Sequence, residues 1–219
     1  MKLYLDTASV ADWQSLMPTG IFHGITTNPL LAARAGLSYR TIDWRTMARK
    51  AADLGAKELH AQVHGDPDGY ADWAATLYDI GKETGIQTVV KIPLVEPAIR
   101  ATPDIKALGG PILMTACYDA KQMFIAQALD ADFIAPYYGR MIEAGIDAKS
   151  HLSAMKAIQP DHGDKCEILV ASLRGTSQMV ELAQLGMDVF TIAPDIAHDL
   201  LREDNSEIAF KAFELAAGS

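Results

Sequence analysis

The stretch TVVKIPL, residues 88–94, reads as a β-strand that carries a lysine at its centre. Its β-branched and aliphatic residues suit a pleated surface, and such a nearly continuous apolar run is typical of a strand buried on both faces of a parallel sheet. Burying the ammonium group of Lys91 there costs on the order of several kcal/mol, unless the group is paired or neutral. Lys91 is therefore either an irregularity that the fold tolerates or a chemically functional group.

Seven more short apolar runs are similar to this stretch, and segments with apolar residues at helical spacing separate them. In chain order the eight runs are KLYLDTA (2–8), GITTN (24–28), ELHAQVH (58–64), TVVKIPL (88–94), PILMTAC (111–117), DFIAPYYG (132–139), EILVASL (167–173) and DVFTIAP (188–194). Eight alternations of strand and helix within 219 residues are typical of a (β/α)8 barrel, the TIM barrel. We therefore predict an α/β protein with a single (β/α)8 barrel domain over residues 1–219.

A doubly wound open sheet is the alternative α/β fold. It usually has a glycine-rich phosphate-binding turn after its first strand, whereas Asp6, Thr7 and Ala8 lie at that place here. The barrel is therefore the preferred prediction. Residues 205–217 add an amphipathic helix, which we expect to pack either on its own barrel or on a neighbouring subunit.

Net charge, the length of the apolar stretches and the cysteines indicate which partners and which cellular location to expect. The net charge of −9 repels polyanions, so we expect no nucleic-acid partner. The N-terminus has no signal-peptide pattern, and no apolar stretch reaches the roughly 18 residues of a membrane-spanning helix. Cys117 and Cys166 form no CxxC pair, which fits a reducing compartment. We therefore expect a soluble, cytoplasmic protein without a membrane partner.

In a barrel enzyme the reacting groups come from the C-terminal ends of the strands. Five candidates near those ends can carry chemistry: Lys91, Asp6, Tyr137, Gln62 and Thr115. Desolvation lowers the pKa of a lysine amine, and the neutral amine can form a Schiff base with a carbonyl carbon. The protonated imine then accepts the electron pair of a breaking C–C bond. Asp6 or Tyr137 is available as the base, and Thr115 and Gln62 can hold a water for proton transfer.

Two arginines follow neighbouring strands near the same end of the predicted barrel. Arg140 and Arg174, with Ser172 nearby, have the chemistry of a phosphate site, because guanidinium groups bind phosphate through paired hydrogen bonds. The loops after strands seven and eight often form such a site in this fold. The expected substrate is a sugar phosphate with its carbonyl at Lys91. Each arginine alone also has an ordinary explanation as a partner in a surface ion pair.

Seven sequence blocks, in this order, resemble the transaldolase family: LYLDTA, GITTNPLL, AQV, VVKIP, MTACY, APYYGR and ASLRG. The resemblance extends from residue 3 to about residue 195. It is strongest to the small branch of the family, which contains fructose-6-phosphate aldolase and the short transaldolases. The order and spacing of TTNP and VVK-P make the resemblance specific.

The resemblance implies a (β/α)8 barrel in which Lys91 forms the Schiff base and Asp6 assists proton transfer. It also implies that Thr26 and Asn28 contact the dihydroxyacetone portion of the substrate, although an asparagine before a proline also suits a turn or a helix start. The implied phosphate-binding residues are Arg140, Ser172 and, as a further candidate, Arg174.

Small members of this family usually form rings of ten subunits built from two pentamers, with the C-terminal helix on a neighbour. The resemblance therefore implies a homo-oligomer, a pentamer or a decamer, and Phe210 and Phe213 suit such a contact. A Schiff-base reaction requires no cofactor. The histidine and carboxylate spacings show no metal-binding motif, so we expect neither a cofactor nor a metal.

The resemblance leaves two activities to distinguish. Gln62 and Tyr137 match the aldolase branch, whereas transaldolases have glutamate and phenylalanine there; Gly139 and Arg174 point toward transaldolases. Because a phenol near the enamine adds a proton donor, we predict reversible C3–C4 cleavage of a ketose phosphate such as fructose 6-phosphate, with dihydroxyacetone held on Lys91. The alternatives are a transaldolase, which transfers dihydroxyacetone between sugar phosphates, and an inactive barrel that binds a sugar phosphate.

Overall fold

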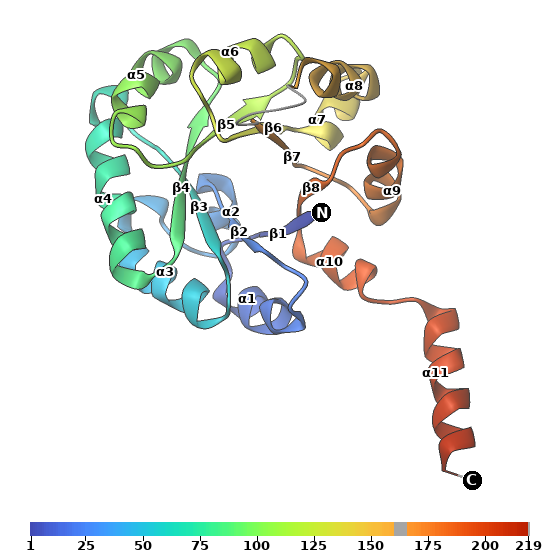
Figure 1. The fold of residues 1–219 in the computed structure, drawn as a ribbon. Coiled ribbons are helices and arrows are strands. Elements are labelled where there is room, and N and C mark those ends of the chain that lie inside the picture. The colour runs from blue at the N-terminus through green and yellow to red at the C-terminus, as the bar shows by residue number, and fades with distance from the viewer. Residues whose placement is uncertain (160–165, 219) are drawn as a thin grey trace.

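The computed structural model describes residues 1–159 and 166–218 of the chain. The eight predicted runs form a closed parallel barrel, in which each strand hydrogen-bonds to the next and β8 pairs with β1 (Figure 1). The strands are β1 (Lys2–Asp6), β2 (Gly24–Thr26), β3 (Glu58–Gln62), β4 (Gln87–Pro93), β5 (Ile112–Cys117), β6 (Phe133–Pro136), β7 (Glu167–Val170) and β8 (Val189–Ile192). The predicted (β/α)8 barrel is confirmed. The open sheet is excluded, because the first and last strands are hydrogen-bonded to each other.

Helices surround the barrel, and at least one helix follows each strand (Figure 1). They are α1 (Val10–Leu16), α2 (Pro29–Arg34), α3 (Trp44–Asp53), α4 (Tyr70–Thr84), α5 (Glu96–Lys106), α6 (Gln122–Ala128), α7 (Tyr138–Glu143), α8 (Ala148–Ile158), α9 (Thr176–Gln184), α10 (Pro194–Leu200) and α11 (Asp204–Ala217), with short 3-10 helices η1 (Met17–Thr19), η2 (Tyr39–Thr41) and η3 (Pro67–Gly69). Within the described residues, none of these helices has the length and apolar character needed to cross a membrane.

Successive residues of β4 face opposite sides of the barrel wall. Val90 and Ile92 pack in the apolar layer between strands and helices, whereas Val89 packs inside the barrel with Leu113 of β5. Because side-chain direction alternates along a strand, Lys91 shares the inward face of Val89. The lysine at the centre of TVVKIPL therefore points into the barrel.

The N-terminal end of the barrel interior holds a buried polar cluster. Glu58 accepts a hydrogen bond from the Tyr4 hydroxyl at 2.9 Å, and its carboxylate lies 2.7 Å from His60 Nε2 and 3.3 Å from His23 Nε2. Burial alone would raise the pKa of Glu58, but its hydrogen bonds, first that with His60, hold the pKa down at about 2. The Glu58 carboxylate is thus fully engaged by neighbouring side chains and stabilises this end of the scaffold.

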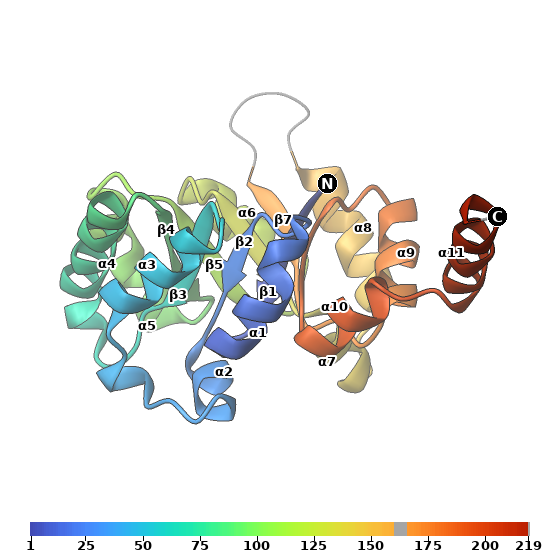
Figure 2. The same cartoon turned by 90° about the horizontal axis from the view of Figure 1, so that it is seen from below.

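The last helix, α11, extends away from the barrel (Figures 1 and 2). None of its described residues is buried, and its large apolar side chains are exposed: Ile208, Phe210, Phe213 and Leu215. Of the two predicted packings for this helix, the one on its own barrel is therefore wrong. The contact with a neighbouring subunit stays a prediction.

Candidate active site

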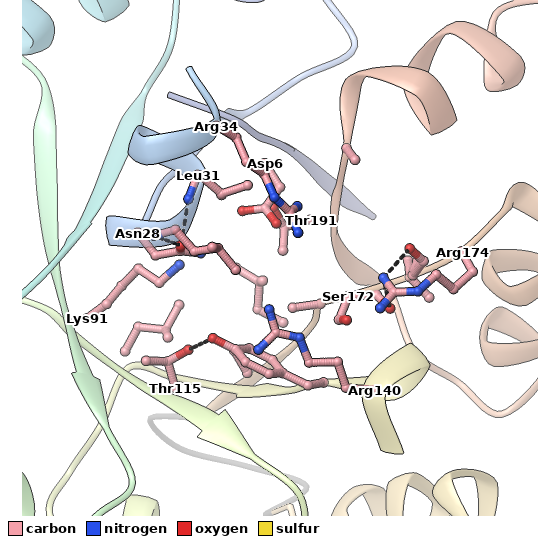
Figure 3. A pocket seen from close by; sticks show the side chains of 18 of the residues that line it. Asp6, Asn28, Leu31, Arg34, Lys91, Thr115, Arg140, Ser172, Arg174 and Thr191 are labelled. Atoms are coloured by element: carbon pink, nitrogen blue, oxygen red, sulfur yellow. Dashed lines mark hydrogen bonds between the residues drawn. The ribbon is translucent and has the colours of Figure 1, made fainter. Parts of the chain in front are cut away.

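A cavity of about 290 Å³ opens at the C-terminal end of the barrel (Figure 3). It lies where the strands end: Asp6 is the last residue of β1, and Tyr137 directly follows β6. Most of the predicted site residues line it, namely Asp6, Asn28, Lys91, Thr115, Tyr137, Arg140, Ser172 and Arg174. Thr26 and Gln62 are not among the lining residues.

Lys91 enters the cavity from β4 and is only 4% exposed. Its amine forms no hydrogen bond or ion pair with another residue in the ranges that the structure describes. Burial lowers the pKa of the Lys91 amine, and the nearby Asp6 carboxylate raises it in part. The amine is therefore accessible from the cavity and closer to neutrality than a lysine in water, as attack on a carbonyl carbon requires.

Asp6 is held in place by the Thr26 hydroxyl, which in turn bonds to the Thr191 hydroxyl. Thr26 Oγ1 donates to Asp6 Oδ1 at 2.6 Å, and it also lies 2.6 Å from Thr191 Oγ1. Thr26 is fully buried, whereas Thr191 belongs to the cavity wall. The structure thus places Thr26 as a residue that orients the carboxylate and not as part of the cavity surface.

Asn28 is the N-terminal cap of α2. Its Oδ1 accepts hydrogen bonds from the backbone N–H groups of Leu30 at 2.9 Å and Leu31 at 3.0 Å. Pro29 occupies the first position of the helix, where its fixed φ is favourable and its missing N–H costs nothing. The TTNP block is therefore the junction of a strand and a helix, and this junction brings the Asn28 amide to the cavity.

Tyr137 lies between a hydroxyl and a guanidinium group. Its hydroxyl is 2.9 Å from Thr115 Oγ1, and the Arg140 guanidinium carbon lies 4.9 Å from the centre of its ring, a cation–π distance. Burial raises the pKa of Tyr137, while the hydrogen bond with Thr115 lowers it in part. The phenol is therefore protonated at neutral pH and can donate a proton inside the cavity.

The backbone at Ser172 is strained and tightly packed. Ser172 has φ of +61°, a left-handed conformation that is uncommon for residues other than glycine and is often found at functional sites. The Gly139 N–H donates to the Ser172 carbonyl oxygen at 2.9 Å. A Cβ atom at position 139 would overlap that oxygen, so the YYGR block requires a glycine there.

The side chain of Arg174 already donates hydrogen bonds to other residues of the protein. Its Nε donates to Glu143 Oε1 at 2.7 Å, and its Nη1 donates to the carbonyl oxygens of Ser172 at 3.2 Å and Leu173 at 3.3 Å. The guanidinium group lines the cavity, but much of its donor capacity is already used.

Gln62 is the last residue of β3 and pairs in register with Lys91 of β4. Its backbone is held by the Tyr39 hydroxyl, which accepts from Gln62 N at 2.6 Å and donates to Gln62 O at 2.8 Å. Residues that pair across parallel strands point to the same side of the sheet. The Gln62 side chain therefore points into the barrel, as that of Lys91 does, although Gln62 is not one of the residues that line the cavity.

Several lining residues were not singled out from the sequence. Three come from α2, namely Leu30, Leu31 and Arg34, and an apolar group lines the cavity near Lys91: Leu113, Ala135, Leu169 and Ala171. Helical spacing after Asn28 is the signal that could have indicated the first three, because residues three and four positions apart share one side of a helix.

The cavity thus combines an amine shifted toward neutrality, a fixed carboxylate, a protonated phenol and guanidinium groups. These groups can form a Schiff base, move protons and bind an anion. In the part of the chain that the structure describes, no three His, Cys, Asp or Glu residues gather so as to hold a metal ion.

Comparison with known proteins assigns this chain to a family. The sequence profile described as Transaldolase/Fructose-6-phosphate aldolase matches residues 3–217. The chain belongs to the transaldolase/fructose-6-phosphate aldolase family. This confirms the family that the sequence blocks indicated. Because the family name covers a transferase and a lyase, the choice between them and the roles of individual residues stay predictions.

Relatives within the transaldolase/fructose-6-phosphate aldolase family span nearly the whole chain. A "Probable transaldolase" from Phenylobacterium zucineum is 32% identical over 218 residues, which cover 97% of this chain and 94% of that relative. Another, from Symbiobacterium thermophilum, is 27% identical over 213 residues, which cover 97% of this chain and 95% of that relative. Among solved structures, 3-hexulose-6-phosphate synthase from Salmonella typhimurium matches with a TM-score of 0.65 and 19% identity, covering 90% of this chain and 91% of that one. This last likeness concerns the fold alone.

Proposed function

We propose that this protein is a class I aldolase that uses Lys91 to cleave and form the C3–C4 bond of a ketose phosphate such as fructose 6-phosphate. One observation carries the proposal: the Lys91 amine is buried inside the barrel, is shifted toward its neutral form and reaches a cavity that Asp6 and Tyr137 also line. A buried lysine without a function would be expected to pair with a counter-charge, because an unpaired buried cation is costly.

The reaction begins when Lys91 Nζ attacks the C2 carbonyl carbon of the ketose. Loss of water from the carbinolamine leaves a protonated imine. Asp6 then removes the proton of the C4 hydroxyl, the C3–C4 bond breaks, and its electron pair passes into the imine to form an enamine. The aldehyde portion, with its phosphate, leaves. The imine is the electron sink, so the proposal includes no cofactor.

The fate of the enamine distinguishes a lyase from a transferase. Tyr137, protonated and hydrogen-bonded to Thr115, is the proposed donor of a proton to C3. Hydrolysis of the resulting imine, with a water held near Thr115 and Gln62, then releases dihydroxyacetone and restores Lys91, and this water also carries the proton taken up by Asp6 back to Tyr137. We propose this lyase outcome because the phenol supplies the required proton inside the site.

The phosphate of the substrate is proposed to bind at Arg140 and Ser172, with Arg174 beside them. All three line the cavity, and Arg140 forms no ion pair with any residue of the described ranges. A guanidinium group without a counter-ion is well suited to a phosphate, which it can bind through two parallel hydrogen bonds.

Transaldolase activity is the second candidate, because the similar proteins carry that name. The test is cleavage of fructose 6-phosphate with and without erythrose 4-phosphate. We expect free dihydroxyacetone to appear without the acceptor, and Tyr137→Phe to slow its release by about 100-fold. Product that forms only when the acceptor is present would instead identify a transaldolase. No turnover in either assay would favour the inactive sugar-phosphate-binding barrel.

We further propose that α11 packs on a neighbouring subunit of a homo-oligomer, a pentamer or a decamer. Its exposed apolar residues, among them Phe210 and Phe213, would otherwise remain in water. Deletion of residues 203–219 is expected to reduce the number of subunits in the assembly, as measured by native mass spectrometry, whereas a monomeric full-length chain would contradict this proposal.

A cytoplasmic location is also part of the proposal. Cys117 and Cys166 are both free and buried, and burial raises the pKa of each thiol to about 12. Two reduced, unreactive cysteines are compatible with a reducing compartment.

A further inference from the structure

Arg34 is a cavity residue to which neither the sequence motifs nor the proposed reaction gives a role. It is the last residue of α2 and lies on the helix side that also carries Leu30 and Leu31. Figure 3 shows Arg34 and Arg140 entering the cavity from opposite walls, the first from α2 and the second from α7. Their guanidinium groups therefore share one space.

The guanidinium groups of the cavity differ in what they already bind. Arg174 donates to Glu143 at 2.7 Å and to two backbone carbonyl oxygens. Neither Arg34 nor Arg140 forms an ion pair with another residue among those described. The N–H donors that remain for a ligand thus belong chiefly to Arg34 and Arg140. The pair expected from the sequence was Arg140 and Arg174.

Arg34 and Arg140 form no ion pair among the described residues, although the carboxylates of Asp6 and Glu143 also line the cavity, so their like charges favour the binding of an anion between them. The chain as a whole has a net charge of −9, whereas the three guanidinium groups that line this cavity, those of Arg34, Arg140 and Arg174, outnumber its two carboxylates, those of Asp6 and Glu143. A phosphate dianion between the two groups would neutralise both and accept charge-assisted hydrogen bonds from each planar fork. The exposed position of Arg34 leaves its side chain free to adjust to such an anion.

We propose that Arg34 is a phosphate-binding residue of this site and contacts the phosphate of the sugar phosphate from the wall opposite Arg140. The identity of the ligand as a sugar phosphate rests on the proposed function. Arg34 thereby determines the preference for phosphorylated over unphosphorylated aldehydes, and Arg174 stabilises the loop at Ser172 through its carbonyl contacts.

The test uses inorganic phosphate as the probe, so that binding is measured apart from catalysis. Isothermal titration compares the full-length protein with Arg34→Gln, Arg34→Lys and a control, Arg100→Gln, which removes an exposed arginine of α5 that pairs with Glu96 outside the cavity. We expect the Kd for phosphate to rise about 10- to 100-fold in Arg34→Gln. It should rise less in Arg34→Lys, which keeps the charge but loses the fork, and stay within about twofold in the control.

A kinetic measurement connects the site to substrate choice. With dihydroxyacetone as donor, the ratio of kcat/KM for glyceraldehyde 3-phosphate to that for glyceraldehyde should fall about 10- to 100-fold in Arg34→Gln. Phosphate binding in Arg34→Gln equal to that of the unaltered protein, or no phosphate binding by the unaltered protein, would overturn the inference. Failure of the proposed function looks different: borohydride with dihydroxyacetone would leave Lys91 unmodified, while phosphate binding and its loss in Arg34→Gln persisted.

Discussion

Lys91→Met is expected to lower the rate of fructose 6-phosphate cleavage by at least about 10,000-fold. Methionine has nearly the length of lysine but no nitrogen that can form an imine, so the C3–C4 bond loses its electron sink. Asp6 and Tyr137 remain in the cavity, but proton transfer alone does not stabilise the carbanion. A coupled assay for the released aldehyde measures the loss.

Borohydride trapping checks the same prediction at the level of the covalent intermediate. Reduction in the presence of dihydroxyacetone should add a stable mass to Lys91 of the unaltered protein and none to Lys91→Met. The fold should survive, because the change replaces a buried amine that has no hydrogen bond or ion pair among the described residues by an apolar side chain of similar length. The matched control is Lys82→Met, an exposed lysine of α4 paired with Asp79. Undiminished turnover by Lys91→Met would rule out the Schiff-base mechanism.

The pH dependence follows from the same amine. Burial lowers the pKa of Lys91, and the neutral amine is the nucleophile. The kcat/KM value should therefore rise with pH through this lowered pKa and level off below the ordinary lysine pKa of about 10.4.

Asp6→Asn is expected to lower kcat by about 100- to 10,000-fold, the range of a lost general base, with a much smaller change in KM. Asparagine keeps the shape of the side chain and an oxygen that can still accept from Thr26 Oγ1, which donates at 2.6 Å in this structure. The variant therefore removes the charge and the basicity while leaving the local packing in place. Steady-state kinetics with fructose 6-phosphate measures both constants.

A second readout separates this role from a structural one. The Asp6 carboxylate raises the pKa of Lys91 in part. Without that negative charge the amine pKa falls further, so the rising limb of the pH profile should move to lower pH in Asp6→Asn. The control is Asp12→Asn in α1, whose carboxylate accepts from Thr7 Oγ1 at 3.0 Å outside the cavity. An unshifted profile with full kcat in Asp6→Asn would contradict both parts of the prediction.

Much of the fold could be predicted because strand burial leaves a direct trace in the sequence. The run 88–94 is apolar on both faces, as expected of a strand inside a closed barrel, and β4 spans Gln87–Pro93. The predicted ends of several runs were too long by two or more residues. GITTN, for example, contributes only Gly24–Thr26 to β2, because Asn28 caps the helix that begins at Pro29.

The site was less predictable wherever a role depends on partners distant in the sequence. The Thr26 side chain bonds to Asp6 and is buried, so it is absent from the cavity surface. Arg174 is held by Glu143, a contact between residues 31 positions apart that no motif encodes. The sequence also did not predict whether α11 packs on its own barrel. An amphipathic pattern shows that a helix has an apolar face to bury, but it does not show which surface covers that face.

The carboxamide of Asn28 is divided between two tasks. Its oxygen serves the first turn of α2, through Leu30 and Leu31, and what remains is an NH₂ group that can only give hydrogens. A ligand therefore meets a hydrogen-bond donor at that point. A hydroxyl or carbonyl oxygen can accept a hydrogen bond there, whereas an ammonium group, which only donates, cannot. The way in which α2 begins thus leaves a hydrogen-bond donor at this point of the cavity wall.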